Sequence, residues 1–426
     1  MRPTYNYALS LTSQFPFCSM PLRLDSYSAC QFACHYCFAA ARGGASTKRR
    51  LQAAEPDALR RRLERMDSGA KPASMIDEML SAKIPIHFGG MSDPFNPLEH
   101  ELRTTYKLLE VLASFDYPTV ISTKSDMCVQ DEYIALLKRR NFVTQISLSS
   151  SSDELLERMD IGAPNATRRL QAIRTLADAG AVATCRIQPV LPKREDDVPE
   201  LIERLAQAGA RHVSVEHLKL AVEPSNHLRL SSALGFDVKQ YFEEAGSTRV
   251  GREWVLPVEY RVRQQVEHRR LAHNSGMLYG AADSDLLHLS DGSSCCSGVD
   301  LLGLKSRFTF TFTQAVRAAR DFRIEFHSIA DEWRPQKSIA RYVNSKSRLG
   351  KSSGVEAYIR DSWNGLAHGA SPAMYYGVRP TDEYDGEGCR IYQLDPSVAR
   401  LMLNRNAPES PPSSQGKPRG SHKCSR

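Results

Sequence analysis

The sequence lacks an apolar run long enough to span a bilayer, and its first residues lack the charged start and apolar stretch of a secretory signal. We therefore expect a cytoplasmic protein without a membrane partner. The chain also lacks an overall excess of charge of one sign. Its formal net charge is +7, but the surplus lies in residues 1–50 and 401–426, and residues 51–400 are close to neutral. By composition, the bulk of the chain is not a basic clamp for nucleic acid.

One internal stretch departs from this balance. Residues 334–351 contain no acidic residue and carry Arg334, Lys337, Arg341, Tyr342, Lys346, Arg348 and Lys351. Such a stretch is compatible with a solvated surface segment and with a segment that follows a phosphate backbone. Both interpretations stay open at this point.

Short apolar segments alternate with amphipathic segments through the first half of the chain. The pattern predicts strands over 22–24, 85–88, 119–123, 145–149, 182–190 and 212–216, and helices over 55–82, 99–113, 131–140, 165–180 and 198–208. Strands that alternate with helices form parallel sheets with right-handed crossovers. The sequence therefore predicts an α/β fold, a partial (β/α)6 TIM-type barrel with an additional C-terminal α+β domain.

The same reading divides the chain into four parts. Residues 1–20 are expected to be an N-terminal extension, and residues 21–225 to be the core domain. Residues 226–403 are expected to form the C-terminal domain, whose fold we do not assign. Residues 404–426 are rich in proline and serine, which predicts a disordered tail.

Three of the ten cysteines are closely spaced. Cys30, Cys34 and Cys37 form a C-x₃-C-x₂-C pattern. Three thiolates at this spacing can hold three corners of an iron–sulfur cube and leave the fourth iron open to another ligand. The alternative is a structural zinc site, which needs a fourth ligand. His35, Cys18 or a distant cysteine could supply that ligand.

A second pair of cysteines, Cys295 and Cys296, is adjacent in sequence. They could bind a second cluster together with Cys389, donate hydrogen, or be two ordinary thiols in a turn. Adjacent cysteines rarely bridge to each other, because the geometry is strained.

The three-cysteine motif, with Tyr36 before its last cysteine, resembles that of the radical S-adenosylmethionine (SAM) superfamily. Residues 89–99, Gly-Gly-Met-Ser-Asp-Pro-Phe-Asn-Pro-Leu-Glu, are similar to a segment of the branch that contains spore photoproduct lyase and "DNA repair photolyase"-like proteins. Residues 108–112, 121–125 and 168–173 extend the resemblance, which covers residues 21–220.

This resemblance implies an enzyme with a [4Fe–4S] cluster and SAM as cofactors, supplied with electrons by a flavodoxin-type or ferredoxin-type donor. It implies that Cys30, Cys34 and Cys37 bind the cluster. For the methionine part of SAM, it implies that Gly89, Gly90 and Met91 present backbone groups to the amine and that Lys124 pairs with the carboxylate. For the adenosine part, it implies that Ser147 or Ser149 bonds the ribose and that Gln188 bonds the ribose or adenine. Tyr36 is expected to pack beside the cluster loop or to touch the adenine.

The activity implied is reductive cleavage of SAM to a 5′-deoxyadenosyl radical, which abstracts hydrogen from the substrate. Three alternatives stay open: a radical enzyme that repairs or modifies nucleic acid, one that acts on a protein, peptide or small metabolite, and a non-catalytic zinc-stabilised module that binds nucleic acid. The lyases return hydrogen from a cysteine, but this chain has none between Cys37 and Cys128. We assign no catalytic residue and no oligomeric state.

Overall fold

The computed structural model describes residues 5, 8–12, 14–41, 51–292, 295–304, 306–342, 354–365 and 371–403. The tail predicted over 404–426 lies outside these residues. Among the described residues, no helix has the length and apolar character needed to cross a membrane.

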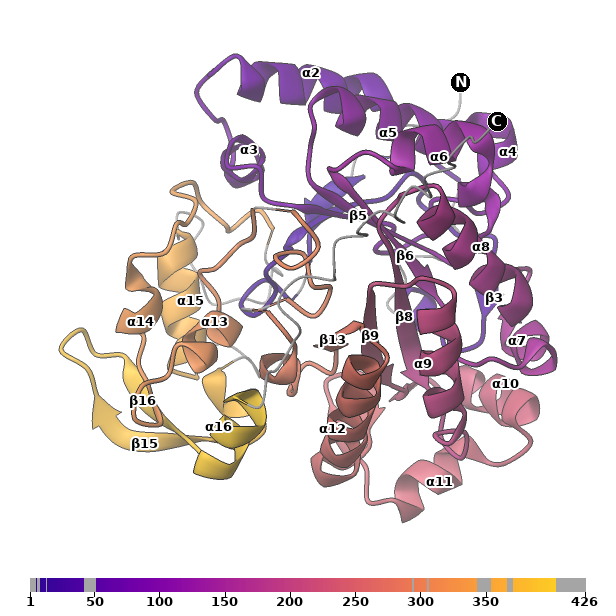
Figure 1. Ribbon diagram of the computed structural model, residues 1–426. Helices are drawn as coiled ribbons and strands as arrows, with labels where there is room; N and C mark the ends of the chain where they lie inside the picture. Colours follow the sequence, from indigo (N-terminus) through magenta and orange to yellow (C-terminus); the bar gives the residue numbers. More distant parts are fainter. Residues whose placement is uncertain are drawn as a thin grey trace, which may run out of the picture.

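An eight-stranded sheet forms the centre of the molecule (Figure 1). Its strands, in spatial order, are β1 (Leu9–Leu11), β2 (Leu22–Leu24), β4 (Ile86–Phe88), β5 (Thr119–Thr123), β6 (Phe142–Ser147), β8 (Ala183–Val190), β9 (His212–His217) and β13 (Leu278–Ala281). β1 pairs antiparallel with β2, and the other neighbours pair in parallel. The predicted α/β fold, a partial TIM-type barrel, is confirmed.

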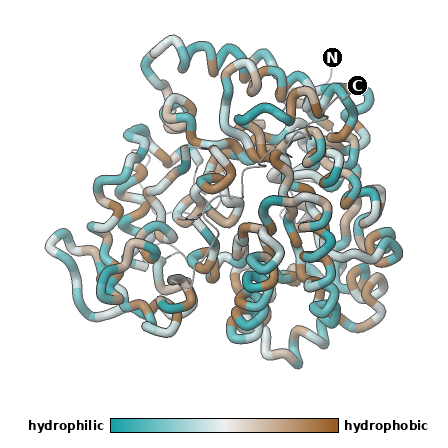
Figure 2. The backbone as a smooth tube through the Cα atoms, viewed as in Figure 1, coloured by the Kyte–Doolittle hydropathy of each residue, from teal (hydrophilic) through white to brown (hydrophobic). Residues whose placement is uncertain are grey.

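Helices lie around this sheet, and the longer ones carry both polar and apolar residues (Figures 1 and 2). They are α1 (Phe38–Ala41), α2 (Pro56–Asp67), α3 (Met75–Ser81), α4 (Glu99–Leu102), α5 (Thr104–Ser114), α6 (Asp131–Leu137), α7 (Asp153–Met159), α8 (Ala166–Asp178), α9 (Asp197–Gln207), α10 (Pro224–Leu234), α11 (Val238–Glu244) and α12 (Val258–Asn274). Asn165 caps α8, because its side chain accepts a hydrogen bond from the Arg168 N–H.

Two predicted helices are interrupted. The single helix expected over 55–82 is two helices, α2 and α3, separated by a loop that contains Gly69 and Pro72. The helix expected over 99–113 breaks into α4 and α5 at Arg103, whose φ is +50°.

The strand expected over 145–149 runs instead from Phe142 to Ser147, which places Ser149 in the loop that follows it.

Further elements form an additional α+β part, as predicted (Figure 1). One small sheet contains β14 (Arg323–Ile324), β16 (Arg390–Leu394) and β15 (Val378–Tyr384), and another contains β10 (Lys219–Ala221), β12 (Glu253–Val255) and β11 (Thr248–Val250). The helices are α13 (Phe312–Arg317), α14 (His327–Ala330), α15 (Val355–Trp363) and α16 (Pro396–Leu403), with single turns η2 (Leu287–Leu289) and η3 (Pro372–Met374). Another single turn, η1 (Met127–Val129), lies between β5 and α6. β13 follows residue 225 yet joins the central sheet; the domain boundaries stay a prediction.

The segment that follows β13 packs into the barrel. Cys295, Val299, Leu302 and Leu304 are buried in one apolar cluster with Met20, Val120 of β5 and Val143 of β6. The approach is close, because a Cβ built on Gly280 of β13 would lie 1.9 Å from the carbonyl oxygen of Cys296. This segment therefore supplies part of the interior of the incomplete barrel.

The end of β4 needs a glycine for two reasons. Gly89 has a φ of +92°, and a Cβ built there would lie 2.5 Å from the carbonyl oxygen of Ser122 on the neighbouring strand. Any other residue would therefore strain the backbone at this φ, and its Cβ would also clash with the neighbouring strand.

We expect Gly89→Ala to destabilise the fold by more than the about 1–2 kcal/mol that left-handed backbone strain alone costs. Gly180 is a matched control, because its φ is +81° and nothing lies within 4 Å of a Cβ built there. Urea unfolding of the two alanine variants measures the difference. Equal losses would show that β4 and β5 can separate at little cost.

Candidate functional site

A pocket with a cavity volume of about 320 Å³ lies at the carboxyl ends of the parallel strands. Enzymes with this type of sheet carry their active sites at that edge. The pocket is lined by most of the residues that the sequence selects, namely Cys30, Cys34, Tyr36, Cys37, Gly89, Gly90, Met91, Lys124, Ser147 and Gln188. Ser149 does not line it and is buried.

The cysteine loop is fixed to the body of the domain through a short antiparallel ladder. β3 (Ala33–Cys34) pairs with β7 (Asp160–Ile161), and Cys34 lies opposite Asp160. The next residues continue the attachment, because the His35 N–H donates to the Met159 carbonyl over 3.0 Å and the Tyr36 hydroxyl donates to the Asp160 carboxylate. The loop therefore holds its thiols against α7 and β7.

Asp160 forms a fully buried ion pair with Arg169 of α8. Arg169 Nη1 lies 2.7 Å from Asp160 Oδ2, and both side chains are 0% exposed. The same guanidinium donates to the carbonyls of Pro164 and Ser147, over 2.8 and 3.0 Å. Burial by itself raises the pKa of Asp160, but the charges of Lys124 and Arg169 outweigh it and lower this pKa to about 2. The carboxylate is thus charged at neutral pH.

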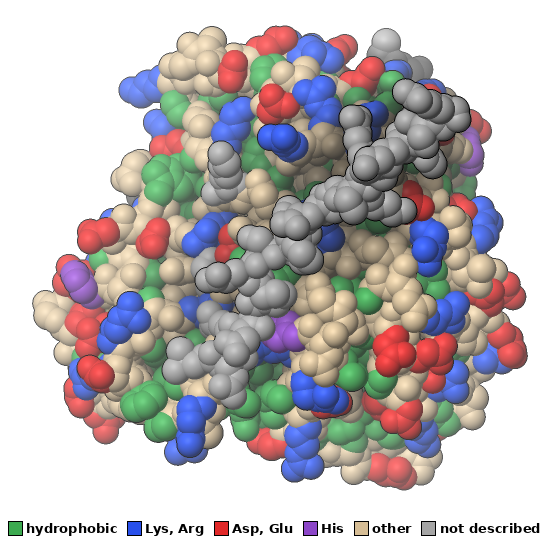
Figure 3. Space-filling model, viewed as in Figure 1, with side chains coloured by type: hydrophobic (Ala, Val, Ile, Leu, Met, Phe, Trp, Pro, Cys, Tyr) green, Lys and Arg blue, Asp and Glu red, His purple; other side chains and the backbone are tan. Residues whose placement is uncertain are grey.

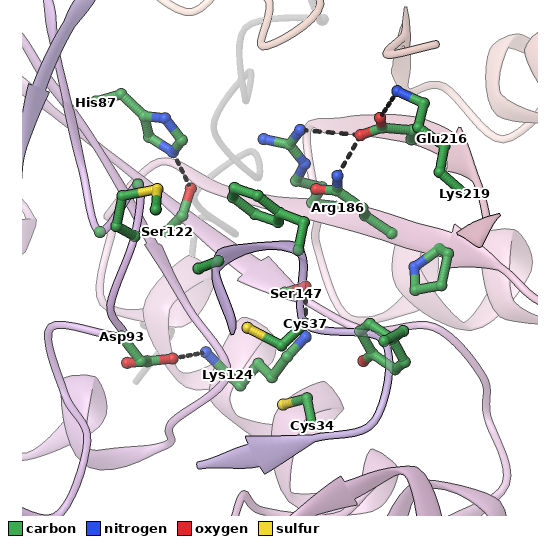
Figure 4. Close-up of a pocket in the computed structure, with 18 of the residues that line it drawn as sticks. Cys34, Cys37, His87, Asp93, Ser122, Lys124, Ser147, Arg186, Glu216 and Lys219 are labelled. Carbon is green, nitrogen blue, oxygen red and sulfur yellow. Dashed lines mark hydrogen bonds and ion pairs between the residues drawn. The ribbon is translucent and has the colours of Figure 1, made fainter. Parts of the chain in front are cut away.

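Lys124 follows β5 and points into the pocket beside the cysteines (Figure 4). Its Nζ donates to Ser147 Oγ over 3.0 Å, lies 3.9 Å from Asp160 Oδ2 and stands 5.2 Å from the centre of the Tyr36 ring. These contacts hold a positive charge at the cysteine end of the pocket.

Two carboxylates, the buried Asp25 and the half-buried Asp93, order the glycine-rich strand end. Asp25 accepts hydrogen bonds from the N–H groups of Met91 and Ser92, over 2.7 and 3.1 Å. Asp93 accepts from the N–H groups of Phe95 and Lys124 and from the Thr123 hydroxyl. Burial raises the pKa of both carboxyls, and these donors oppose the rise. Asp93 thus orders its own loop and fixes the start of the Lys124 loop.

The thiols of the loop are close enough to influence one another. Burial raises the pKa of Cys30 to about 12, and Asp93 and Cys37 add to the rise. The pKa of Cys34 is also raised, by burial first and then by Asp160, while Lys124 opposes the rise. Bound iron would favour the thiolate forms, because a metal ion deprotonates a coordinating thiol. Within the described part of the chain, no three His, Cys, Asp or Glu side chains lie close enough together to hold one metal ion. The three thiols nevertheless line the same pocket as Lys124, and a cluster with one open iron takes three thiolate ligands.

A second group of charges lies at the other end of the pocket, away from Cys34 and Cys37 in Figure 4. Glu216 of β9 accepts hydrogen bonds from the amide of Gln188 and from Lys219, whose Nζ lies 2.5 Å from Glu216 Oε1. Arg186 of β8 reaches the same carboxylate over 3.4 Å. Across the pocket, His87 Nε2 lies 2.8 Å from Ser122 Oγ.

Several of these residues were not selected from the sequence. Arg186 alternates with Gln188 along a predicted strand, and this alternation could have revealed it. Asp160 gave no signal. Arg169 lies in the segment 168–173 that extends the resemblance, but it was not selected for the site, because an ion pair between a short strand and a helix depends on the tertiary fold.

The basic stretch over 334–351 is only partly described. Arg334 donates to Glu356 over 2.5 and 2.8 Å, so this guanidinium is held by a carboxylate. Lys346, Arg348 and Lys351 lie outside the described residues. Basic and acidic side chains of the described residues are interspersed over the face seen in Figure 3.

Residues 25–205 match the family model of the Radical SAM superfamily. The predicted recognition is therefore confirmed at the level of the superfamily. The matched segment is a radical SAM domain, which supports the predicted enzyme, and a [4Fe–4S] cluster and SAM are the cofactors of this superfamily. No curated protein matches the chain.

Solved structures with similar architecture include spore photoproduct lyase complexed with dinucleoside spore photoproduct. It is 17% identical, has a TM-score of 0.48, and the match covers 64% of this chain and 80% of that one. SuiB of Streptococcus suis bound to the precursor peptide SuiA is 14% identical with a TM-score of 0.34, over 53% of this chain and 48% of that one. Similarity at this level says nothing about the substrate of this chain.

We expect Asp160→Asn to cost about 3–5 kcal/mol of unfolding free energy, because it leaves the buried Arg169 charge without its carboxylate. The variant should also expose Cys34 and Cys37 to faster alkylation, because the Tyr36 hydroxyl would then donate to a neutral amide oxygen, which is a weaker acceptor than the carboxylate. Urea unfolding and thiol labelling of the unreconstituted protein measure both effects. Glu132→Gln is the control, since Glu132 pairs with Arg103 at the surface and surface pairs contribute little. If both variants behave alike, Asp160 does not anchor the loop.

Proposed function

We propose that Cys30, Cys34 and Cys37 bind a [4Fe–4S] cluster and that the enzyme uses it to cleave SAM reductively for hydrogen abstraction from a substrate. One observation carries this proposal: the three thiols and the residues expected to bind SAM line one pocket. When bound, these cofactors supply a 5′-deoxyadenosyl radical, and the protein's own groups must bind and orient the reactants and exclude water.

The contacts of the pocket support individual roles toward SAM. The ammonium of Lys124 is available beside the cysteines for the carboxylate of the cofactor. The amine of SAM needs hydrogen-bond acceptors. The N–H groups of Gly89 and Met91 already donate to Leu24 and Asp25, so the groups that remain for the amine at the end of β4 are backbone carbonyls. Tyr36 packs beside Lys124 and stabilises the loop.

Ser147 and Gln188 are our candidates for the ribose and adenine. Both line the pocket, and Gln188 is oriented by its hydrogen bond to Glu216. Ser149 is less suitable than Ser147, because it is buried outside the pocket lining. We retain the roles of Ser147 and Gln188 as proposals.

Replacing Cys30, Cys34 and Cys37 by alanine should abolish the cluster. We expect the anaerobically reconstituted protein to be brown, to contain about four irons per chain, and to show a paramagnetic reduced state that changes when SAM is added. The triple variant should be colourless and contain almost no iron. Cys389→Ala, which changes a buried cysteine outside the pocket lining, is the matched control.

A different metal content would contradict the proposal. Colourless protein with one zinc per chain would favour the zinc-stabilised binding module. A reduced cluster whose signal does not respond to SAM would remove the role of the open iron.

For the substrate we propose nucleic acid first, in line with the resemblance to the photoproduct-lyase branch, and a protein, peptide or small metabolite as the alternative. We expect single-stranded or duplex DNA or RNA to stimulate SAM cleavage and to bind in a salt-dependent way. Measuring cleavage with and without each nucleic acid at two salt concentrations tests this. Absence of both stimulation and salt-dependent binding would leave the alternative.

The chemistry requires an external reductant, and we propose a flavodoxin-type or ferredoxin-type donor. A cytoplasmic location is proposed with it.

A further inference from the structure

We propose that Arg23 and Arg186 bind an oxyanion group of the substrate, a phosphate or a carboxylate, in the pocket that the cysteines also line. The inference rests on the proposed function, because it identifies a chemical feature of the molecule that this enzyme would act on. It is carried by the hydrogen bonding and position of the two guanidinium groups.

The first observation concerns Arg186. Within the described residues, its hydrogen bonding is limited to one long contact of 3.4 Å with Glu216, and its buried Nε has no hydrogen-bond partner. Glu216 is held more closely by Lys219 and Gln188. Buried guanidinium donors normally have acceptors. The donors of Arg186 are therefore available to a molecule in the pocket, where its side chain is 20% exposed.

The second observation concerns Arg23 of β2. Its guanidinium pairs with Asp25 through Nε at 3.1 Å and donates through Nη2 to Ser10 over 2.9 Å. These contacts fix the group and use only part of its donor set. Its alkyl chain lies over Gly90, where a Cβ would come within 2.3 Å of Arg23 Cδ. The glycine thus makes room for the arginine to lie across the β4 end.

Arg23, His87 and Arg186 all line the same pocket. His87 lies between their strands, on β4, and its pKa is lowered to about 3 by burial first and then by the charges of Arg186 and Arg23. The imidazole is therefore neutral at neutral pH, so it does not repel the guanidinium groups and does not form an ion pair with a bound anion. Cys18 and Cys296 border the same region, where Arg186 lowers the pKa of both thiols against the larger effect of burial.

Carboxylates are also present, and their positions define the limits of the site. Asp25 lies behind Arg23, and Glu216 lies between Arg186 and Lys219. Glu253 lines the pocket close to Lys219. Each of these carboxylates thus approaches its neighbouring cation from one side only. Guanidinium groups match phosphate and carboxylate oxygens with paired donors, so an oxyanion between Arg23 and Arg186 would complete both donor sets.

The site is separate from the end of the pocket proposed for the SAM carboxylate. Lys124 contacts Ser147, Asp160 and Tyr36 at the cysteine end, whereas Arg186 lies with Glu216 and Lys219 (Figure 4). One pocket can therefore hold a carboxylate of the cofactor at one end and an oxyanion of the substrate at the other.

Anion-dependent stabilisation of the reconstituted full chain tests the proposal, with inorganic phosphate and acetate as probes and chloride at equal ionic strength as the reference. Phosphate should raise the thermal midpoint in a saturable manner, because an anion that binds only the folded state stabilises it. In Arg186→Gln the half-saturating phosphate concentration should rise about tenfold or more, as expected when a charge-assisted hydrogen bond is lost. Arg186→Lys should retain part of the effect.

Arg174→Gln makes the same charge change on the exposed face of α8 and should behave like the unmodified protein. The midpoint of each variant in chloride reports whether it folds. A second readout needs no variant: phosphate should protect Arg186, relative to Arg174, from phenylglyoxal. An acetate effect equal to that of phosphate assigns a carboxylate, and an effect of phosphate alone assigns a phosphate.

The proposal is overturned if Arg186→Gln keeps the half-saturating concentration of the unmodified protein, or if neither anion stabilises the protein nor protects Arg186. Neither readout uses cleavage of SAM. If only the anion site is wrong, the iron content and the SAM-dependent signal stay intact. If the proposed function is wrong, the iron content and the SAM-dependent signal are lost.

Discussion

The buried ion pair between Asp160 and Arg169 is the interaction on which the arrangement of the site depends. Burying two charges is costly unless their remaining donors and acceptors are satisfied. Here they are largely satisfied, because Tyr36 donates to Asp160 and Arg169 donates to the carbonyls of Pro164 and Ser147. One carboxylate thus connects the cysteine loop to α8 and to the end of β6. It also holds Lys124 near the thiols through a longer ion pair.

The incompleteness of the barrel explains the other half of the pocket. Parallel strands place their loops at one edge, but an open barrel leaves its interior exposed. Residues 295–304 fill part of this interior, packed so closely that Gly280 can carry no side chain. Cys296 consequently lines the pocket although it follows Cys37 by more than half of the chain. The C-terminal half is therefore part of the site's architecture as well as an appended unit.

Much of the architecture was predictable from the sequence, because it is written in local patterns. Alternating apolar strands and amphipathic helices gave the parallel sheet, and the cysteine spacing with the glycine pair gave the residues that meet in the pocket. The failures have local causes that the periodicity does not encode. Arg103 adopts a left-handed backbone conformation inside an otherwise helical pattern, and β6 ends before Ser149. The pair of Asp160 and Arg169 depends on β7 and α8 meeting in space, which no local pattern reports.

A single carboxylate, Glu216, links the residue proposed for the ribose or adenine to the arginine proposed for the substrate oxyanion. Glu216 accepts from Gln188, our candidate for the ribose or adenine, and contacts Arg186, our candidate for the substrate oxyanion. Lys219 supplies its closest cation. An oxyanion on Arg186 would compete with Glu216 for the guanidinium, and Lys219 and Gln188 would keep the carboxylate in place. The enzyme could thus admit a negatively charged substrate beside Glu216 without displacing the group that orients Gln188.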